Sequence, residues 1–538
     1  MMSRFADAAK VATSKYPKTT NKTIKYGTAG FRSKAEELDF IMYRMGLLAA
    51  LRACDTKAAI GVMITASHNP VQDNGVKLVD PMGEMLAPAW EVHATTLVNA
   101  SDDEIPRALE KIGGEARIDL NHSPLVFVGR DTRPSSSQLC DAVISGVRVV
   151  GGDVKDLGVI TTPIIHYVIT CHNDGGTYGV PSEEGYYQKI CEAFVKLRSS
   201  GASNGNYEPI VYYDGANGVG ALMIANFLKH LGNSLSVSIY NDDGVLNHLC
   251  GADYVKVQQK WPEGVPRIQN VRCVSVDGDA DRVIYSYIDS NDKYHMLDGD
   301  KIATLIAGYI QELLKNSGLK LKLGLVQTAY ANGASTEYIT RKLGVPVACA
   351  MTGVKHLHHM ALQFDIGVYF EANGHGTVIF SKEARAAIRD AAQRNNENAN
   401  KLSQVLDVIN ETVGDAISDM LLVETVLHAR GWSIFDWDKA YADLPNRQMK
   451  VTVADRTVIT TTDAERVCVT PEGLQNSINE MVKAYPQGRS FVRPSGTEDI
   501  VRVYAEASSQ EQADELAIKV AGAVYDQAGG VGSKPQSL

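Results

Sequence analysis

The chain has 538 residues, of which 44% are apolar and 22% are charged, and its formal net charge at pH 7 is −10. This length exceeds what one hydrophobic core usually serves, so we expect three to four domains. The composition is that of a globular protein without a membrane-spanning run, and the negative charge disfavours a nucleic acid or an anionic membrane as partner.

The N-terminus, MMSRFADAAKVATSKY, lacks an apolar core of signal-peptide length and is better explained as a first helix. The eight cysteines are scattered, with neither C-x-x-C nor paired zinc spacing, so we expect reduced thiols. We therefore expect a cytoplasmic protein, and no obligate protein partner is evident in the sequence.

Short apolar, β-rich runs alternate with longer helical patterns along the chain. The expected strands include residues 60–65, 125–128, 210–213, 271–276, 323–326 and 366–370. This alternation predicts repeated α/β units with mostly parallel sheets that are covered on both faces. The stretch 383–430 is predicted to be almost continuously helical and to end at Gly431.

Two changes of composition indicate domain boundaries. The stretch 198–208 is rich in Gly, Ser and Asn and lies just before a new strand. Beyond residue 445 the pattern changes to short strands and a terminal helix near 510–527, which indicates a small final domain. We divide the chain into residues 1–200, 201–298, 299–445 and 446–538.

The first loop that can carry chemistry is TASHNP (65–70), which directly follows an apolar strand. Active sites of α/β proteins lie at such strand ends. Ser67 could accept a phosphoryl group, because serine hydroxyls form covalent intermediates that divide one transfer into two steps. Taken alone, the loop is explained equally well as a turn built by Ser, Asn and Pro.

The second loop, DGDADR (277–282), brings the carboxylates of Asp277, Asp279 and Asp281 together after the run VRCVSV. Three hard oxygen ligands on one tight loop suit Mg²⁺. An EF-hand calcium loop does not fit, because Ile288 stands where that loop needs a glutamate. A solvated acidic turn is the remaining alternative.

The third loop, RPSGT (493–497), lies between the expected strands 490–492 and 500–507. Arg493 and Arg502, two hydroxyls and the backbone exposed at glycine form a cradle for a dianion. A surface turn with solvated arginines is the alternative. Neither a Walker A nor a G-x-G-x-x-G pattern occurs, which disfavours nucleotide binding.

The fourth loop, EANGHG (371–376), also follows an apolar strand. It offers acceptors, an amide and the imidazole of His375 to a polyhydroxyl ligand, although His375 could equally be a hydrogen-bonded turn residue. The cluster KHLHH (355–359) has no acidic third ligand nearby, so we interpret it as a helix start and not as a metal site.

Together, the four loops resemble those of the α-D-phosphohexomutase superfamily. TASHNP is similar to its phosphoserine loop, DGDADR to its metal loop, EANGH to its sugar-recognition loop, and RPSGT with Arg502 to its distal phosphate loop. Within the superfamily, the chain most closely resembles the phosphoacetylglucosamine mutase branch of eukaryotes. Further segments carry this likeness: YGTAGFR (26–32), DNGVKLVDP (73–81), LNHLCGADYVK (246–256), FEANGHGT (370–377) and FVRPSGTED (491–499).

The resemblance implies three mixed α/β domains and a smaller C-terminal α+β domain around a central cleft. Residues 1–200 then carry the phosphoserine loop, 201–298 the metal loop, 299–445 the sugar-recognition loop and 446–538 the distal phosphate loop. The implied enzyme is an isomerase that interconverts N-acetylglucosamine 6-phosphate and 1-phosphate through phospho-Ser67 and a 1,6-bisphosphate. It would use Mg²⁺ and would feed UDP-N-acetylglucosamine synthesis.

The resemblance also implies roles for individual residues. The metal ligands are Asp277, Asp279 and Asp281, with a phosphoserine oxygen of Ser67. The catalytic residues are Ser67, with Lys77 and His375 for proton transfer and with Arg32 and Arg133 as contacts to the transferring phosphoryl group. The substrate-binding residues are His68, Glu371, Ala372, Asn373, Arg493, Pro494, Ser495, Gly496, Thr497 and Arg502.

Two features depart from the glucose and mannose mutases of the superfamily. The strand and loop VGRDTRP (128–134) follow the serine loop here, whereas they precede it in typical members. Asn373 also stands where the wider family commonly has serine. Phosphoglucomutase or phosphomannomutase activity remains the alternative, and a metal-dependent sugar phosphatase is less favoured because hydrolysis has no use for a second anion cradle.

Overall fold

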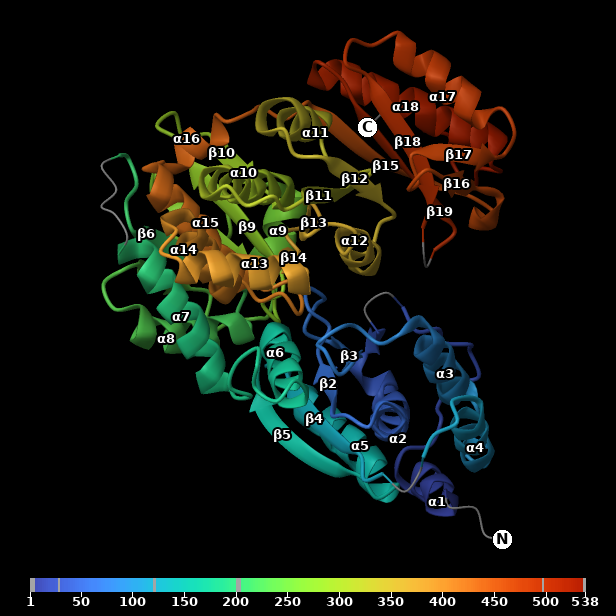
Figure 1. The fold of residues 1–538 in the computed structure, drawn as a ribbon. Helices are drawn as coiled ribbons and strands as arrows, with labels where there is room; N and C mark the ends of the chain where they lie inside the picture. Colours follow the sequence, from blue (N-terminus) through green and yellow to red (C-terminus); the bar gives the residue numbers. More distant parts are fainter. Residues whose placement is uncertain (1–4, 28–29, 120–121, 200–204, 496–497, 536–538) are drawn as a thin grey trace. The chain divides into compact units, whose positions relative to one another are not determined.

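The computed structural model describes residues 5–27, 30–119, 122–199, 205–495 and 498–535 (Figure 1). The chain forms two compact units. The first consists of Met1–Asp298, Asn373–Thr377 and Lys401–Ile434, and the second of Gly299–Ala372, Val378–Asn400 and Phe435–Leu538.

The first unit begins with a five-stranded sheet of order β1-β3-β2-β4-β5. Its strands are β1 (Phe31–Lys34), β2 (Ile60–Ile64), β3 (Asp73–Val79), β4 (Leu125–Arg130) and β5 (Asp153–Val159). Strands β2, β4 and β5 are parallel, whereas β3 and β1 are antiparallel to their neighbours. The helices of this part are α1 (Ala6–Lys15), α2 (Asp39–Thr56), α3 (Pro88–Asn99), α4 (Ile105–Glu115), α5 (Ser136–Val149), α6 (Thr162–Asn173) and α7 (Glu183–Ser199), with a 3₁₀ turn at Ala35–Glu37.

Helices α2 and α5 pack against each other through two glycines. A Cβ on Gly46 would lie 2.1 Å from the carbonyl oxygen of Val143, and a Cβ on Gly146 would lie 2.1 Å from that of Tyr43. Only glycine permits this backbone approach. The two helices thereby share one core with β2 and β4, which fixes the strand that ends at the Ser67 loop.

A second five-stranded sheet of the first unit has the order β10-β9-β8-β6-β7. Its strands are β6 (Ile210–Asp214), β7 (Ser236–Tyr240), β8 (Arg272–Val276), β9 (Val283–Ile288) and β10 (Tyr294–Leu297). Strand β6 is parallel to β7 and β8, and β9 is antiparallel to β8 and β10. Helices α8 (Val219–Leu231) and α9 (Gly251–Gln258) belong to this part, and α15 (Ala416–Arg430) packs against α7 and β9.

The second unit contains a four-stranded sheet of order β12-β11-β13-β14, in which β11 is parallel to β12 and β13. The strands are β11 (Leu323–Thr328), β12 (Val347–Ala350), β13 (Ile366–Phe370) and β14 (Gly376–Phe380). Its helices are α10 (Gly299–Ser317), α11 (Gly333–Glu337), a π-helical segment Tyr338–Leu343, α12 (Val354–Ala361), α13 (Lys382–Gln393) and most of α16 (Ile434–Asp438). Helix α14 (Glu397–Val408) lies mostly within Lys401–Ile434 and so belongs mostly to the first unit.

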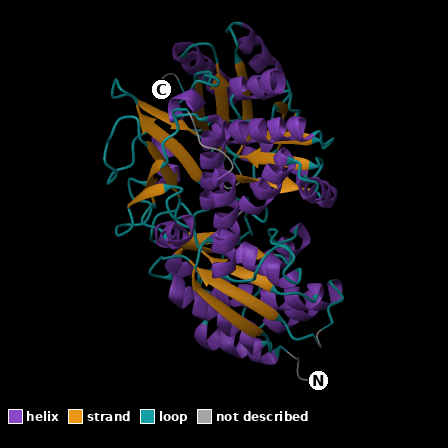
Figure 2. Cartoon of the chain, turned by 60° about the vertical axis from the view of Figure 1, so that its left-hand side comes forward, coloured by secondary structure: helices purple, strands orange, loops and turns teal. Residues whose placement is uncertain are grey.

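The C-terminal part of the second unit is smaller. An antiparallel sheet of order β15-β19-β18 consists of β15 (Asn446–Thr452), β18 (Arg489–Pro494) and β19 (Ile500–Glu506). A hairpin of β16 (Thr460–Thr462) and β17 (Val467–Thr470), a 3₁₀ turn at Arg456–Val458 and the helices α17 (Leu474–Lys483) and α18 (Gln510–Gln527) complete it. In this part, as in the others, helices flank the strands (Figure 2).

The predicted class, three mixed α/β parts and a smaller α+β part, is confirmed, and each of the expected strands named above is present. The sheets are more mixed than predicted, because β1, β3, β9 and β10 pair antiparallel. The stretch 383–430 is largely helical, as predicted, but it consists of three helices, with interruptions after Gln393 and after Val408. It does end at Gly431, which has the left-handed φ of +64° typical of a helix C-terminus.

The division predicted from the sequence is finer than the two compact units, and we retain it as a proposal: 1–200, 201–298, 299–445 and 446–538. Residues 200–204 of the expected linker lie outside the described residues. Within the described part of the chain, none of the helices combines the length and apolar character needed to cross a bilayer.

Candidate active site

Ser67 lies in the loop between β2 and β3 and is only 1% exposed. Its φ of +51° falls in the left-handed region, which is uncommon for a residue other than glycine and is often found at functional sites. Its Oγ lies 2.5 Å from Oδ2 of Asp277, and its backbone N–H donates to Oγ1 of Thr65 at 2.9 Å. The predicted phosphoryl acceptor therefore meets the predicted metal loop across 210 positions of sequence.

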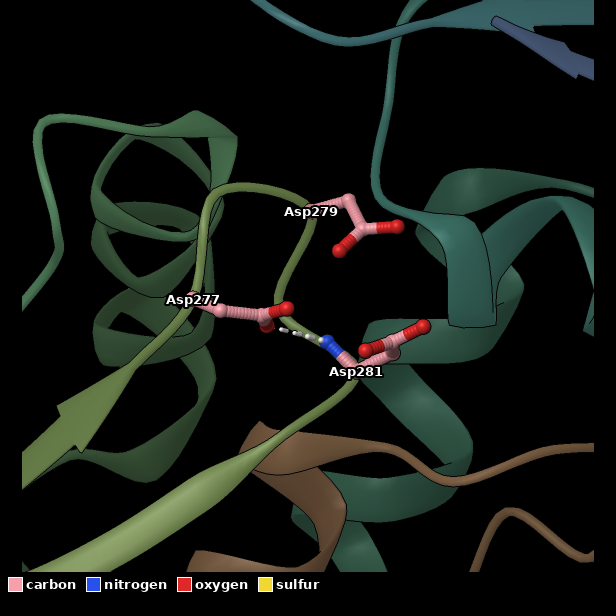
Figure 3. Close-up of side chains that lie close together, drawn as sticks. All are labelled: Asp277, Asp279 and Asp281. Carbon is pink, nitrogen blue, oxygen red and sulfur yellow. Dashed lines mark hydrogen bonds between the residues drawn. The ribbon is translucent and has the colours of Figure 1, made fainter. Parts of the chain in front are cut away.

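The three predicted metal ligands lie on the loop between β8 and β9. One carboxylate oxygen from each of Asp277, Asp279 and Asp281 lies within 4.8 Å of the others, and the side chains face a common space (Figure 3). All three are buried, yet Oδ1 of Asp279 and Oδ1 of Asp281 have no hydrogen-bond partner among the described residues. Buried carboxylate oxygens that lack a partner fit a divalent cation with oxygen preference, so the residues present suit Mg²⁺.

Lys77 on β3 partly neutralises this loop. Its Nζ lies 3.1 Å from Oδ2 of Asp279 and 3.0 Å from Oδ2 of Asp281. Burial lowers the pKa of Lys77, but attraction by these carboxylates outweighs burial and raises it, so the lysine is protonated. Burial, together with repulsion from Asp281 and Asp279, raises the pKa of Asp277 well above its ordinary value.

Arg32 and His68 also lie beside the aspartate loop. Burial, with repulsion from Arg282, lowers the pKa of Arg32, and its buried Nε has no hydrogen-bond partner among the described residues. An unsatisfied guanidinium N–H fits an anionic ligand such as a phosphoryl group. Burial lowers the pKa of His68 to about 3, with Arg282 and Arg32 adding to the effect, so its ring is neutral. Its Nδ1 lies 3.3 Å from Ser67 Oγ.

His375 is attached to the metal loop. Its Nδ1 lies 2.7 Å from the backbone oxygen of Asp281, and Oδ1 of Asn373 accepts its backbone N–H at 2.9 Å. Between them, Gly374 has a φ of +86°, and a Cβ there would lie 2.0 Å from the carbonyl oxygen of Val283. When Nδ1 donates to the Asp281 carbonyl, Nε2 is the ring nitrogen suited to proton transfer with a substrate.

Arg133 does not have the role that the sequence suggested. Its side chain is fully buried and its Nε donates to Asp131 at 3.0 Å. Its two Nη atoms donate at 2.5–2.9 Å to the backbone carbonyls of Ser67, Asn69, Pro70 and Asp73. Because its five donors are all engaged with the protein, the expected contact to the transferring phosphoryl group is wrong. Arg133 instead holds the loop that carries Ser67.

Sequence reasoning missed two further residues of this site. Nδ2 of Asn247 donates to the carbonyls of Ser67 and Asn69 at 2.8 and 3.0 Å. Thr162, at the start of α6, donates its hydroxyl to Oδ2 of Asp279 at 2.6 Å and its backbone N–H to the carbonyl of the same residue at 3.2 Å. Asn247 lies in the segment LNHLCGADYVK (246–256), but nothing in the sequence pattern around Asn247 or Thr162 signals these contacts.

In the second unit, Arg493 on β18 stands directly opposite Arg502 on β19. Like charges directly opposite each other on a sheet destabilise it, which an anionic ligand would relieve. Nε of Arg493 donates to the hydroxyl of Tyr330 at 3.1 Å, and the buried Nε of Arg502 has no partner within the described ranges. Pro494 and Ser495 follow at the end of β18, whereas Gly496 and Thr497 lie outside the described residues.

The sugar-recognition loop begins in the second unit with Glu371 and Ala372, both half-buried after β13. Oε1 of Glu371 accepts the backbone N–H of Gly353 at 3.1 Å. The KHLHH cluster lies in α12, so the predicted helix start is confirmed. His358 Nδ1 lies 3.1 Å from the hydroxyl of Tyr369.

Four family models match consecutive parts of the chain. They are phosphoglucomutase/phosphomannomutase α/β/α domain I (46–105 and 104–181), phosphoacetylglucosamine mutase AMG1 domain II (176–284), AMG1 domain III (298–432) and the phosphoglucomutase/phosphomannomutase C-terminal domain (449–523).

The relatives of this chain include several proteins named phosphoacetylglucosamine mutase. The phosphoacetylglucosamine mutase of Sus scrofa is 55% identical to this chain, and the match covers 98% of this chain and 99% of the relative. That of Homo sapiens is 54% identical to this chain, and the match covers 95% of this chain and 96% of the relative. An Aspergillus fumigatus N-acetylphosphoglucosamine mutase, solved with GlcNAc-6P and magnesium, is 45% identical, with a TM-score of 0.93 over 98% of this chain and 100% of that one. An N-acetylglucosamine-phosphate mutase in its substrate complex is 46% identical, with a TM-score of 0.92 over 96% and 99%.

Proposed function

The chain belongs to the phosphoacetylglucosamine mutase family, and on this premise we propose that it interconverts N-acetylglucosamine 6-phosphate and N-acetylglucosamine 1-phosphate. The reaction passes through phosphorylated Ser67 and a 1,6-bisphosphate. The observation that carries this proposal is the 2.5 Å contact between Ser67 Oγ and Asp277 in the three-carboxylate loop.

In the first half of the reaction, the bond between phosphorus and Ser67 Oγ breaks and a bond to the sugar O1 forms. The proton of the sugar's O1 hydroxyl passes to a base, for which Nε2 of His375 is suited. Ser67 Oγ receives a proton, for which the protonated Lys77, 3.1 and 3.0 Å from Asp279 and Asp281, is suited. Mg²⁺ held by Asp277, Asp279 and Asp281, with an oxygen of phospho-Ser67, supplies neutralisation of the phosphoryl charge when bound. Arg32 orients the phosphoryl group.

The second half returns the other phosphate to Ser67 after the bisphosphate has turned over. Arg493, Arg502 and Ser495 then hold the phosphate that does not react, with Pro494, Gly496 and Thr497 completing that loop. The sugar is bound by Glu371, Ala372 and Asn373 together with His68. A hydrolase would need no such hold on a second phosphate, which disfavours the phosphatase alternative.

The remaining expectations belong to the same proposal. The product would feed UDP-N-acetylglucosamine synthesis in the cytoplasm. The net charge of −10 argues against nucleic acid and anionic membrane as partners, and the ligand is a small phosphorylated hexosamine.

Phosphorus NMR tests the proposed function. The purified protein with Mg²⁺ and a trace of glucose 1,6-bisphosphate should convert N-acetylglucosamine 6-phosphate into the 1-phosphate without releasing inorganic phosphate. A relative was solved with glucose 1,6-bisphosphate, so glucose 6-phosphate belongs in the same assay as a competitor. Release of inorganic phosphate would favour the phosphatase, and equal specificity constants for both sugars would overturn the hexosamine assignment.

A further inference from the structure

The turn between β16 and β17 has an unusual backbone. Asp463, Ala464 and Glu465 have φ values of +52°, +52° and +68°, so three successive residues other than glycine adopt the left-handed region. Such residues visit this region singly, and they remain there when surrounding contacts hold them. The side chain of Glu465 makes contacts of this kind.

One carboxylate joins two parts of the second unit. Oε2 of Glu465 accepts the backbone N–H of Thr352 at 2.9 Å and its hydroxyl at 2.5 Å. Oε1 of the same carboxylate lies 3.4 Å from Nη1 of Arg493. The side chains of Glu465 and Arg493 are only 14% and 17% exposed, so water screens their attraction less than at an open surface.

The contact continues from Thr352 to the sugar-recognition loop. The next residue, Gly353, donates its backbone N–H to Oε1 of Glu371 at 3.1 Å. Gly353 has a φ of +119°, which a residue with a side chain rarely adopts. The dipeptide Thr352-Gly353 is thus held on one side by Glu465 and on the other by Glu371.

We propose that Glu465 is a positioning residue that couples recognition of the distal phosphate to recognition of the sugar. The inference rests on the proposed function, in which Arg493 binds the phosphate and Glu371 the sugar. Glu465 touches neither group of the substrate. It orients Arg493 directly and orients Glu371 through Thr352-Gly353, so that one carboxylate sets both halves of the substrate pocket on the second unit.

Three substitutions separate the two halves of this coupling. Glu465→Ala removes both contacts. Glu465→Gln keeps an oxygen acceptor for Thr352 but loses the ion pair with Arg493. Thr352→Val removes the hydroxyl with little change of shape and leaves Arg493 paired with Glu465.

The experiment is calorimetric titration of the full chain carrying Ser67→Ala, so that bound ligand is not turned over. The ligands are N-acetylglucosamine 6-phosphate, glucose 6-phosphate and inorganic phosphate. Glu465→Ala should weaken binding of the hexosamine phosphate about tenfold and narrow its preference over glucose 6-phosphate, since charged hydrogen bonds are lost. Glu465→Gln should weaken phosphate binding about threefold while the ratio of affinities for the hexosamine phosphate and glucose 6-phosphate stays the same. Thr352→Val should lower this ratio while phosphate binding stays unchanged.

Asp463→Asn is the matched control, because Asp463 lies in the same turn and pairs with Arg466 at 2.6 Å on the exposed surface. It should change none of the three affinities. The coupling would be overturned if Glu465→Ala left the affinities and the preference for the hexosamine phosphate over glucose 6-phosphate unchanged. Tighter phosphate binding by Glu465→Gln would also overturn it, because the carboxylate would then compete with the phosphate for Arg493. If Glu465→Ala does not fold, the other two variants decide. A wild-type chain that binds these ligands but does not interconvert the sugar phosphates would contradict the proposed function and not the coupling.

Discussion

The geometry around Ser67 is set by backbone contacts more than by its own side chain. The carbonyl of Ser67 accepts hydrogen bonds from Arg133 at 2.9 Å and from Asn247 at 2.8 Å, and its N–H is bound by Thr65. The hydroxyl is thereby presented to Asp277 without having to hold the loop itself. Stability and chemistry are therefore separable at this position.

Ser67→Ala should lower mutase activity by several orders of magnitude while leaving the thermal unfolding midpoint nearly unchanged. The substitution removes the acceptor oxygen but none of the backbone bonds of the loop. Activity and thermal unfolding measured on the same preparation check this. Near-normal turnover in the variant would contradict the phosphoserine mechanism.

Asp279→Asn tests the metal loop at a single atom. The amide keeps the shape of the side chain and its oxygen can still accept from Thr162, but the substitution removes the charge of one of the three buried carboxylates. We expect the apparent Mg²⁺ affinity and kcat to fall together, measured by titrating Mg²⁺ into the assay. A magnesium dependence like that of the wild type would show that the loop is only an acidic turn.

The chemistry of these residues could be predicted because their types, and their positions after strands, are visible in the sequence. Ser67, Lys77 and the three aspartates do come together in the first unit. The tasks of Arg133, Asn247 and Thr162 could not be predicted, since their partners include backbone carbonyls, and any residue type offers a carbonyl.

At the scale of elements, the loop after β2 is clamped from two sides. Arg133 reaches it from the loop after β4, and Asn247 reaches it from the segment before α9. Both side chains donate to the same two carbonyls, those of Ser67 and Asn69. The serine loop is therefore tied both to its own sheet and to the part of the chain that carries the aspartates.

Arg133→Lys should lower kcat more than it raises KM, because lysine is a single point donor and cannot satisfy the carbonyls that the planar guanidinium bonds. Each buried carbonyl left without a donor costs about 1–3 kcal/mol, so the free energy of unfolding should also fall. Steady-state kinetics and urea denaturation measure both effects.

The control for Arg133→Lys is Arg130→Lys. Arg130 ends β4, and its guanidinium pairs with Asp156, whose side chain is exposed. Both the kinetics and the stability of this control should stay close to wild type. If the two variants behave alike, Arg133 does not position Ser67.

The buried central strands could be predicted from the sequence, whereas the strands at the edges of the first sheet could not be predicted as well. Buried runs such as β2, β8 and β13 are apolar throughout and stand out from the helical patterns around them. Strand β1 has only four residues and β5 is largely exposed, so neither has a continuous apolar signal. The break between α14 and α15 was missed because residues 409–415 are mostly buried and continue the apolar pattern, although Asp415 caps α15 by accepting the N–H groups of Ile417 and Ser418.

On the scale of the whole molecule, the compact units do not follow the order of the chain. Asn373–Thr377 and Lys401–Ile434 belong to the first unit, although both follow the start of the second. Contacts to the metal loop explain this: Ala416 donates its N–H to the carbonyl of Ala280 at 3.0 Å, and Val283 donates to the carbonyl of Gly374 at 3.1 Å. A division drawn along the sequence has no access to such contacts.

A buried ion pair fastens α15 to the second sheet of the first unit. Glu424 on α15 is fully buried and accepts from Nε and Nη2 of Arg272 at 3.1 and 2.8 Å. The hydroxyls of Tyr207 and Tyr285 donate to the same carboxylate at 2.7 and 3.3 Å. Burial lowers the pKa of Arg272, but attraction by Glu424 outweighs it and raises that pKa, so the guanidinium is charged.

Glu424→Ala should therefore destabilise the first unit by about 3–5 kcal/mol, because it leaves the charge of Arg272 buried without a partner. Urea denaturation of the full chain measures this as a shift of the transition that belongs to the first unit. Glu337→Ala is the control: Glu337 pairs with Arg341 at 2.8 Å on an exposed helical surface, where such a pair contributes about 0–1 kcal/mol. Equal small effects of the two substitutions would show that α15 is held by apolar packing and not by the ion pair. A large effect of Glu424→Ala, with lower kcat at temperatures where the variant is still folded, would show that α15 also supports the aspartate loop through Ala416 and Ala280.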